Sequence, residues 1–198
     1  MERIVRINGR AYTFMPHGTG NPTMYIWASK HAGPQGIYGM DDLQDQESFL
    51  RTLRTDAVLH EFFLNIVYDP TTQKFTYRGT DKEATKFRRD LETDEYKYLT
   101  EIIKMRLLAH DLGFKIIGCD TKAVEGAFDE SLDSKREQEQ ANVIEEYNGC
   151  IERPRLSIIG DEHCQPDSYL NEYLQEKNID YTVIRRLEEI SQRDLVFA

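Results

Sequence analysis

Short apolar runs alternate with longer amphipathic segments, and this alternation most constrains the fold. The runs have the length and composition of buried strands; they read MYIWA, AVLHEFFLNIVYD, FKIIGCDT, RLSIIG and IDYTVIRRL. Several of the segments between them carry apolar residues at helical spacing. Strands that alternate with helices are typical of a parallel sheet with helices packed on its faces. The sequence therefore predicts an α/β fold with a central, largely parallel sheet flanked by helices.

The helices are predicted from acidic amino ends and apolar spacing. The clearest begins in DEYKYL at residue 94, and Gly113 follows it where a helix C-cap belongs. Others are expected after Asp41–Asp42, over about 134–147, and from Pro166–Asp167 onward. The residues of this last helix that we expect to face the core are Tyr169, Leu170, Tyr173 and Leu174.

Two further segments lie outside this alternation. In RIVRINGRAYTFM, the central Asn8-Gly9 pair predicts a β-hairpin over 1–16, at one edge of the sheet. The segment 69–94 is charged and rich in turn residues, with a short strand predicted over Lys74 to Tyr77. We interpret it as a surface excursion or a lid. A length of 198 residues with 39% hydrophobic content suits a single domain over 1–198.

Charge and composition exclude several classes of function. A net charge of -10 argues against a nucleic-acid or anionic-membrane binder, which needs a basic face. No apolar stretch has membrane-spanning length, and MERIVRING lacks the core and cleavage site of a signal peptide. A cytoplasmic protein, or one secreted without a cleaved signal peptide, is therefore expected. Glycine-rich nucleotide-binding loops of the common kinds are absent, which disfavours a nucleotide enzyme.

The three cysteines show no C-x-x-C spacing, so neither a disulfide framework nor a cysteine zinc site is indicated, and reduced thiols are expected. Cys164 follows His163 directly, which suggests a cysteine–histidine nucleophile. Neighbouring residues that leave a strand usually point in opposite directions, so the pair is a weak candidate.

Ionisable side chains interrupt or follow the predicted strands. They are His31 after MYIWA, Glu61 within AVLHEFFLNIVYD, Asp120 at the end of FKIIGCDT, and Asp161, Glu162 and His163 after RLSIIG. Because the carboxyl ends of parallel strands meet at one edge of a sheet, we expect four residues to converge although they are distant in sequence: His31, Glu61, Asp120 and His163. The convergence predicts a functional site at that edge.

Each of these residues also has an ordinary structural explanation. His31 could cap a loop, and Asp120 could cap the segment that follows it. Arg136 could pair with Glu137 or Glu139 on a solvated helix. Glu162 could be a surface charge, or it could support His163.

Four motifs together resemble the erythromycin-esterase, ChaN and TraB/Tiki superfamily. They are ASKH at 28–31, HEFF at 60–63, Arg136 followed by QANVI, and GDEH at 160–163. The resemblance implies that His31 and His163 are paired histidines, with Glu61 as their acidic partner. It further implies that Arg136 anchors or polarises a substrate. Ala28 stands where the pattern has glycine, and the charged segment after Glu61 has no clear counterpart.

Two histidines and a carboxylate support two kinds of chemistry. His31, Glu61 and His163 could bind a divalent ion such as Mn, Co or Zn and activate its water. Alternatively, one histidine oriented by Glu61 could act as a general base while Arg136 stabilises negative charge. Asp120 and Glu162 are candidates for supporting the bound group.

The resemblance implies, as the leading function, a hydrolase of esters or amides with a small-molecule or peptide substrate. A ChaN-like protein that binds haem or another ligand in the same cleft is the first alternative. An inactive interaction domain, such as an accessory or bacterial effector protein, is the second.

Overall fold

The computed structural model describes residues 2–29, 40–61, 66–77, 99–120 and 130–187. Its strands are β1 (Arg3–Ile7), β2 (Arg10–His17), β3 (Met24–Ser29), β4 (Ala57–His60), β5 (Ile66–Asp69), β6 (Lys74–Tyr77), β7 (Lys115–Gly118), β8 (Arg155–Gly160) and β9 (Tyr181–Arg186). Its helices are α1 (Met40–Leu53), α3 (Leu99–Leu112), α4 (Glu130–Glu146), α5 (Tyr169–Glu176) and the short 3-10 turn η2 (Asp161–Cys164).

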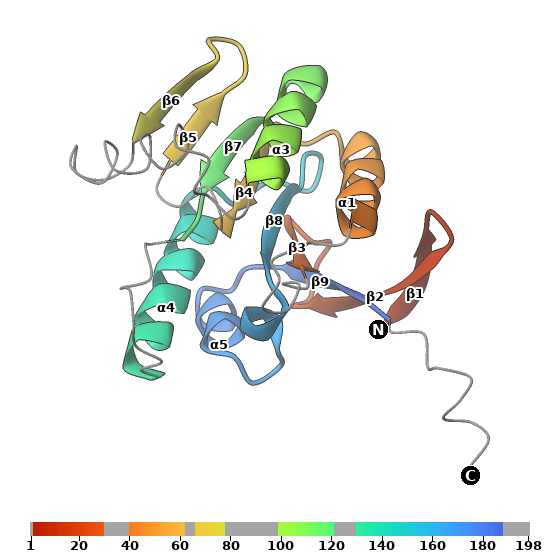
Figure 1. The fold of residues 1–198 in the computed structure, drawn as a ribbon. Coiled ribbons are helices and arrows are strands. Elements are labelled where there is room, and N and C mark those ends of the chain that lie inside the picture. The colour runs from red at the N-terminus through yellow and green to blue at the C-terminus, as the bar shows by residue number, and fades with distance from the viewer. Residues whose placement is uncertain (1, 30–39, 62–65, 78–98, 121–129, 188–198) are drawn as a thin grey trace.

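The strands form one nine-stranded sheet in the order β1-β2-β9-β3-β8-β4-β7-β5-β6 (Figure 1). The central strands β9, β3, β8, β4 and β7 pair in parallel. The strands beyond them pair antiparallel at both edges. The predicted α/β fold with a largely parallel centre is therefore confirmed.

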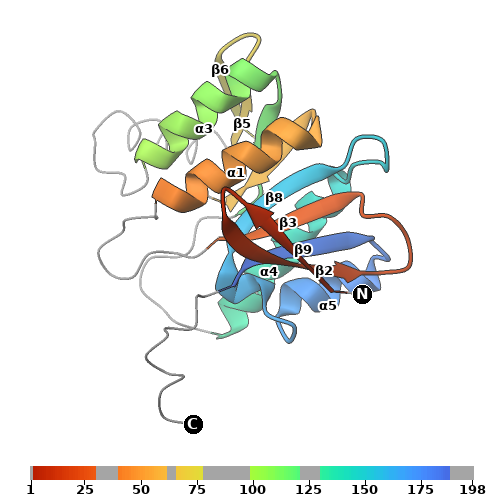
Figure 2. The ribbon, with the colours of Figure 1, turned by 90° about the vertical axis from the view of Figure 1, so that its right-hand side faces the viewer.

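Helices α1 and α3 pack on one face of the sheet, and α4 and α5 pack on the other (Figure 2). On one face, Leu50 of α1 and Ile102 of α3 pack in one core cluster with Trp27 of β3. On the other, Ala141 of α4 and Leu170 of α5 pack in a second cluster. The parallel strands are thus buried on both faces, which explains why their sequences read as continuous apolar runs.

The predicted hairpin is present at the edge of the sheet. Asn8 and Gly9 have φ angles of 49° and 85°, the left-handed values that a tight turn between right-twisted strands requires. The helix predicted from residue 94 is described as α3, and Gly113 at φ 78° donates its N–H to Ala109 O at 2.8 Å where that helix ends.

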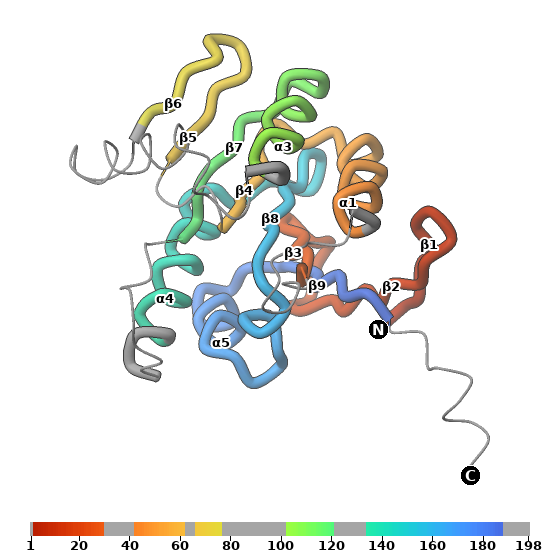
Figure 3. The backbone as a smooth tube through the Cα atoms, viewed as in Figure 1, coloured from red at the N-terminus to blue at the C-terminus, as the bar shows by residue number. Residues whose placement is uncertain are grey.

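One predicted strand is wrong in its extent. Residues 57–69 do not form a single strand: β4 ends at His60, and β5 begins at Ile66 and runs antiparallel to β7. Glu61 therefore follows β4 instead of interrupting a strand. Its carboxyl group accepts the backbone N–H of Gly160, the last residue of the neighbouring strand β8. Figure 3 shows the separate paths of β4 and β5.

The helix after Pro166 starts later than predicted, because Ser168 caps it by accepting a hydrogen bond from Asn171 N at 3.3 Å. Leu170 and Leu174 are buried as expected, and Tyr173 packs partly buried against the core. The inward prediction for Tyr169 is wrong, since this residue is 45% exposed. It is the first residue of the helix and precedes the turn that packs on the sheet.

The charged segment 69–94 is described only in part. Its predicted strand is confirmed as β6, while residues 78–94, and with them the lid interpretation, lie outside the described residues. No helix in the described ranges has the length and apolar content needed to cross a membrane.

Candidate functional site

Glu61 lies directly after β4 and is 1% exposed. Its Oε2 accepts a hydrogen bond from the backbone N–H of Gly160, the last residue of β8, at 2.9 Å. Burial raises the pKa of Glu61 to about 8, and the negative charge of Asp120 adds to the rise. The hydrogen bond from Gly160 and the positive charges of Arg136 and His163 lower this pKa, but by less than burial raises it. At neutral pH this carboxyl group therefore retains its proton in most molecules.

His163 lies in η2, the turn that follows β8, and is buried. Its Nδ1 is 2.7 Å from Oε1 of Glu137 on α4, and the other oxygen of Glu137 accepts the backbone N–H of Leu170 at 2.7 Å. Burial and the positive charge of Arg136 lower the pKa of His163. The hydrogen bond that the ring donates to Glu137, together with nearby negative charge, outweighs both effects, so the net pKa is raised.

The other ring nitrogen of His163 is directed differently. Nε2 is buried and has no hydrogen-bond partner among the described residues. Because Nδ1 is bonded to a carboxylate, it carries the proton of the neutral ring, and Nε2 is then left as the acceptor. A buried acceptor without a partner costs stability, which makes it a candidate position for a ligand or a reacting atom.

Helix α4 contributes a second contact through Arg136, the residue before Glu137. The guanidinium Nε lies 2.9 Å and 2.8 Å from the two carboxylate oxygens of Asp120, just beyond β7. Neighbouring residues of one helix thus bind the ends of two different strands: Arg136 binds Asp120, and Glu137 binds His163. Much of the charge of Arg136 is offset by this ion pair.

Four of the predicted site residues therefore meet at the carboxyl edge of the parallel strands: Glu61, Asp120, Arg136 and His163. Glu162 has an exposed side chain beside His163. His31 lies outside the described residues, so its predicted place remains a prediction.

Sequence reasoning missed Glu137 as a member of the site. It was considered only as a partner of Arg136 on the helix surface, whereas it is 5% exposed and binds His163. One signal could have found it: an acidic residue directly beside the arginine that the motif resemblance had already placed near the site. In the structure Glu137 orients His163. The sequence predicts instead that Glu61 orients one of the histidines.

The thiols near the site are poorly suited to nucleophilic attack. Cys119 and Cys164 are both buried, and burial raises the pKa of each thiol well above its ordinary value. His163 and Cys164 are both turned inward because they lie in the η2 turn, where the alternation of an extended strand no longer applies.

The metal prediction involves Glu61, His163 and His31. Within the described ranges, no group of three or more potential ligands is placed to hold a metal ion. Two of the three predicted ligands are described, and their donor atoms, a carboxylate and an acceptor Nε2, are of the kinds that Mn, Co and Zn accept.

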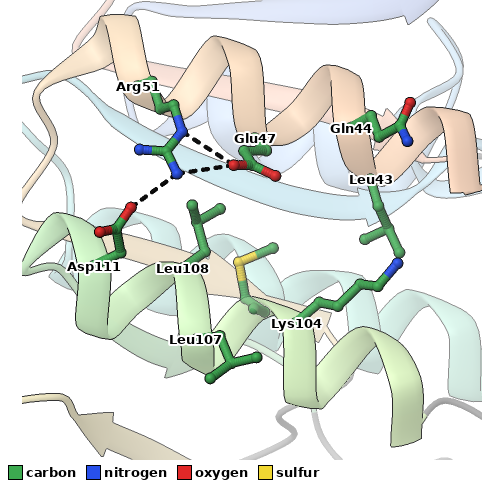
Figure 4. Close-up of a pocket in the computed structure, with 9 residues that line it drawn as sticks. Leu43, Gln44, Glu47, Arg51, Lys104, Leu107, Leu108 and Asp111 are labelled. Carbon is green, nitrogen blue, oxygen red and sulfur yellow. Dashed lines mark hydrogen bonds and ion pairs between the residues drawn. The ribbon is translucent and has the colours of Figure 1, made fainter.

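A surface hollow lies away from this edge, between α1 and α3 (Figure 4). There Arg51 bridges Glu47 and Asp111 at 2.9 Å and 2.8 Å, beside Leu107 and Leu108. Of the predicted site residues that the structure describes, none lines it.

Comparison with known proteins finds no matching family model and no matching curated protein. A solved structure described as "Crystal structure of bacterial protein toxins" is similar at a TM-score of 0.46 and 13% identity. The similarity covers 86% of this chain and 36% of that chain, so this chain spans well under half of that protein's length. A likeness at this level carries no argument about function.

We expect Glu61→Gln to make stability less dependent on pH. The folded chain holds the Glu61 proton up to about pH 8, whereas the unfolded chain releases it near 4.5, so this group lowers the stability of the wild type as pH rises between those values. The variant lacks this loss. From pH 5 to pH 8, its free energy of unfolding should therefore rise by about 1–3 kcal/mol relative to that of the wild type.

Urea denaturation at both pH values measures the effect. Glu162→Gln, at the exposed neighbour of His163, is the control and should stay within about 0.5 kcal/mol of the wild type. If the free energy of unfolding changed with pH by the same amount in the wild type and in Glu61→Gln, Glu61 would have an ordinary pKa.

Proposed function

We propose that this protein is a hydrolase that cleaves an ester or amide bond with water activated beside Glu61 and His163. The motif resemblance to the erythromycin-esterase and TraB/Tiki superfamily favours this class of activity. The observation that carries the proposal is the geometry of His163, whose Nδ1 is bound to the buried carboxylate of Glu137 while Nε2 is left without a described partner.

His163 would act as the general base. Nε2 takes a proton from water as the water oxygen forms its bond to the carbonyl carbon, and the buried Glu137 carboxylate stabilises the imidazolium that results. The same proton then passes from Nε2 to the leaving oxygen or nitrogen as the ester or amide bond breaks. The hydrogen bond at Nδ1 keeps the ring in the tautomer that this step needs.

Glu61 would stabilise the negative charge that develops on the carbonyl oxygen of the substrate. A carboxyl group that keeps its proton at neutral pH can donate a hydrogen bond to an oxygen that gains negative charge. Arg136 adds positive charge near the same edge, reduced by its ion pair with Asp120. The substrate we propose is a small molecule or peptide, because an acidic chain does not favour nucleic acid.

A divalent ion such as Mn, Co or Zn is part of the proposal. Glu61 and His163, together with His31, are the residues that would hold it. Such an ion would polarise the carbonyl group and lower the pKa of water. To hold the ion, Glu61 would have to give up its proton and Nε2 of His163 would serve as a ligand. Base catalysis and metal binding would therefore be alternative uses of the same nitrogen.

Metal binding is expected to strengthen as pH rises. Below about pH 8 an incoming ion must displace the proton of Glu61, so the affinity should increase about tenfold per pH unit for each proton released. Calorimetric titration with Zn²⁺ and Co²⁺ in two buffers of different ionisation enthalpy measures the affinity and the proton release together. Binding that is independent of pH and releases no proton would remove Glu61 as a ligand.

The proposed activity is tested with nitrophenyl esters and fluorogenic peptides, in the presence of Mn²⁺, Co²⁺ or Zn²⁺ and in the presence of a chelator. Turnover of either substrate class is the expected result. Stoichiometric binding of haem, seen as a visible absorbance band, without any turnover would replace the hydrolase with a ligand-binding protein. Neither turnover nor binding of metal or haem would leave an interaction domain.

A further inference from the structure

The ends of β3 and β8 form a pair of neighbouring residues at the site. Ser29, the last residue of β3, lies in register with Gly160, the last residue of β8. Gly160 is also the residue whose N–H binds Glu61 at 2.9 Å. The direction of that N–H, and with it the place of the Glu61 carboxyl group, depends on where the ends of these two strands are held.

Asp42 in the first turn of α1 binds the end of β3 on the face of the sheet that α1 covers. Its Oδ2 accepts the hydroxyl of Ser29 at 3.0 Å, and its Oδ1 accepts Nε1–H of Trp27 at 3.1 Å. Ser29 and Trp27 are two residues apart on β3, so both side chains face α1. Gln46, one turn further along α1, donates to Oδ2 at 3.1 Å.

This arrangement does more than attach α1 to the sheet. Leu50 already packs α1 into the core beneath it, and burying a carboxylate costs free energy that an apolar residue would not. Asp42 directs two of its hydrogen bonds to the last three residues of one strand, at the edge where the site lies.

We propose that Asp42 is a positioning residue, which fixes the end of β3 so that the N–H of Gly160 remains directed at Glu61. This deepens the proposed function and rests on it for the chemical role of Glu61. The contact between Gly160 and Glu61 can be measured without any turnover.

Asp45 offers a matched control on the same helix. It is also buried, and it accepts hydrogen bonds from Tyr12 at 2.6 Å, from Asn8 at 2.7 Å and from Arg10 at 3.1 Å. These partners belong to the N-terminal hairpin and not to the site. Replacing Asp45 therefore removes a comparable buried carboxylate while leaving the ends of β3 and β8 untouched.

The test is NMR of the backbone amides in the full chain at one fixed pH. In Asp42→Asn we expect the Gly160 proton resonance to move upfield, and its hydrogen exchange to accelerate at least about tenfold relative to that of Ile158 in the same strand. Dividing the exchange rate of Gly160 by that of Ile158 removes the effect of a change in global stability. Asp45→Asn should leave both the shift and the ratio as in the wild type.

Ser29→Ala removes the contact from the side of β3, and it should reproduce the change at Gly160 if Asp42→Asn does not fold. The proposal would be overturned if the Gly160 chemical shift and the ratio of Gly160 to Ile158 exchange stayed unchanged in whichever of these variants folds. An equal change of both quantities in Asp45→Asn would also overturn it. Where the hydrolase assay shows turnover, Asp42→Asn should lower kcat at least about tenfold with little change in KM. A change at Gly160 without turnover in the wild type would sustain the positioning role and reject the hydrolase.

Discussion

His163→Asn is expected to lower kcat of the proposed hydrolysis by about 100- to 10,000-fold, the usual contribution of a general base. The asparagine amide can still reach toward Glu137 near the place of Nδ1, but the chain then has nothing at the place of Nε2. The change therefore isolates the buried nitrogen for which the structure describes no partner.

Steady-state kinetics on the best ester or peptide substrate measures this loss, with circular dichroism to show that the variant is folded. His110→Asn is the matched control, because His110 is an exposed histidine on α3 away from the site, and it should retain wild-type activity. A folded His163→Asn with unchanged kcat would remove His163 from the mechanism.

Glu137→Ala is expected to cost about 3–5 kcal/mol of stability, the range for breaking a buried charged pair by deleting one partner. The substitution leaves Nδ1 of His163 and the backbone N–H of Leu170 without their acceptors, and both lie in the buried contact between α4, η2 and α5. Chemical denaturation measures the loss. Glu139→Ala, two residues along the same helix and exposed, should stay within about 0.5 kcal/mol of the wild type.

The same variant should change how stability depends on pH. The raised pKa of His163 contributes stability that is fully present below the unfolded value of 6.5 and is lost as pH rises through the folded value. Glu137→Ala removes the strongest cause of that rise, so its deficit should be larger at pH 5 than at pH 9. A deficit that is the same at both pH values would show that Glu137 does not raise the pKa of His163 in the wild type.

Much of the architecture could be predicted from local sequence patterns. The Asn8-Gly9 turn, the helix that ends at Gly113 and the apolar strands each depend on neighbouring residues, whose spacing is visible in the chain. The meeting of Glu61, Asp120 and His163 could also be predicted, because parallel strands bring their carboxyl ends to one edge.

The partners of these residues were decided only by the tertiary structure. Glu137 binds His163 across 26 residues, and Glu61 binds Gly160 across 99. Periodicity shows which face of a helix turns inward, but it does not show which strand end that face meets, or at what rotation. The sequence by itself therefore determined an α/β sheet with polar residues at the strand ends. The packing of α4 on one face decided that Glu137 binds His163, and the packing of α1 on the other face decided that Asp42 binds the end of β3.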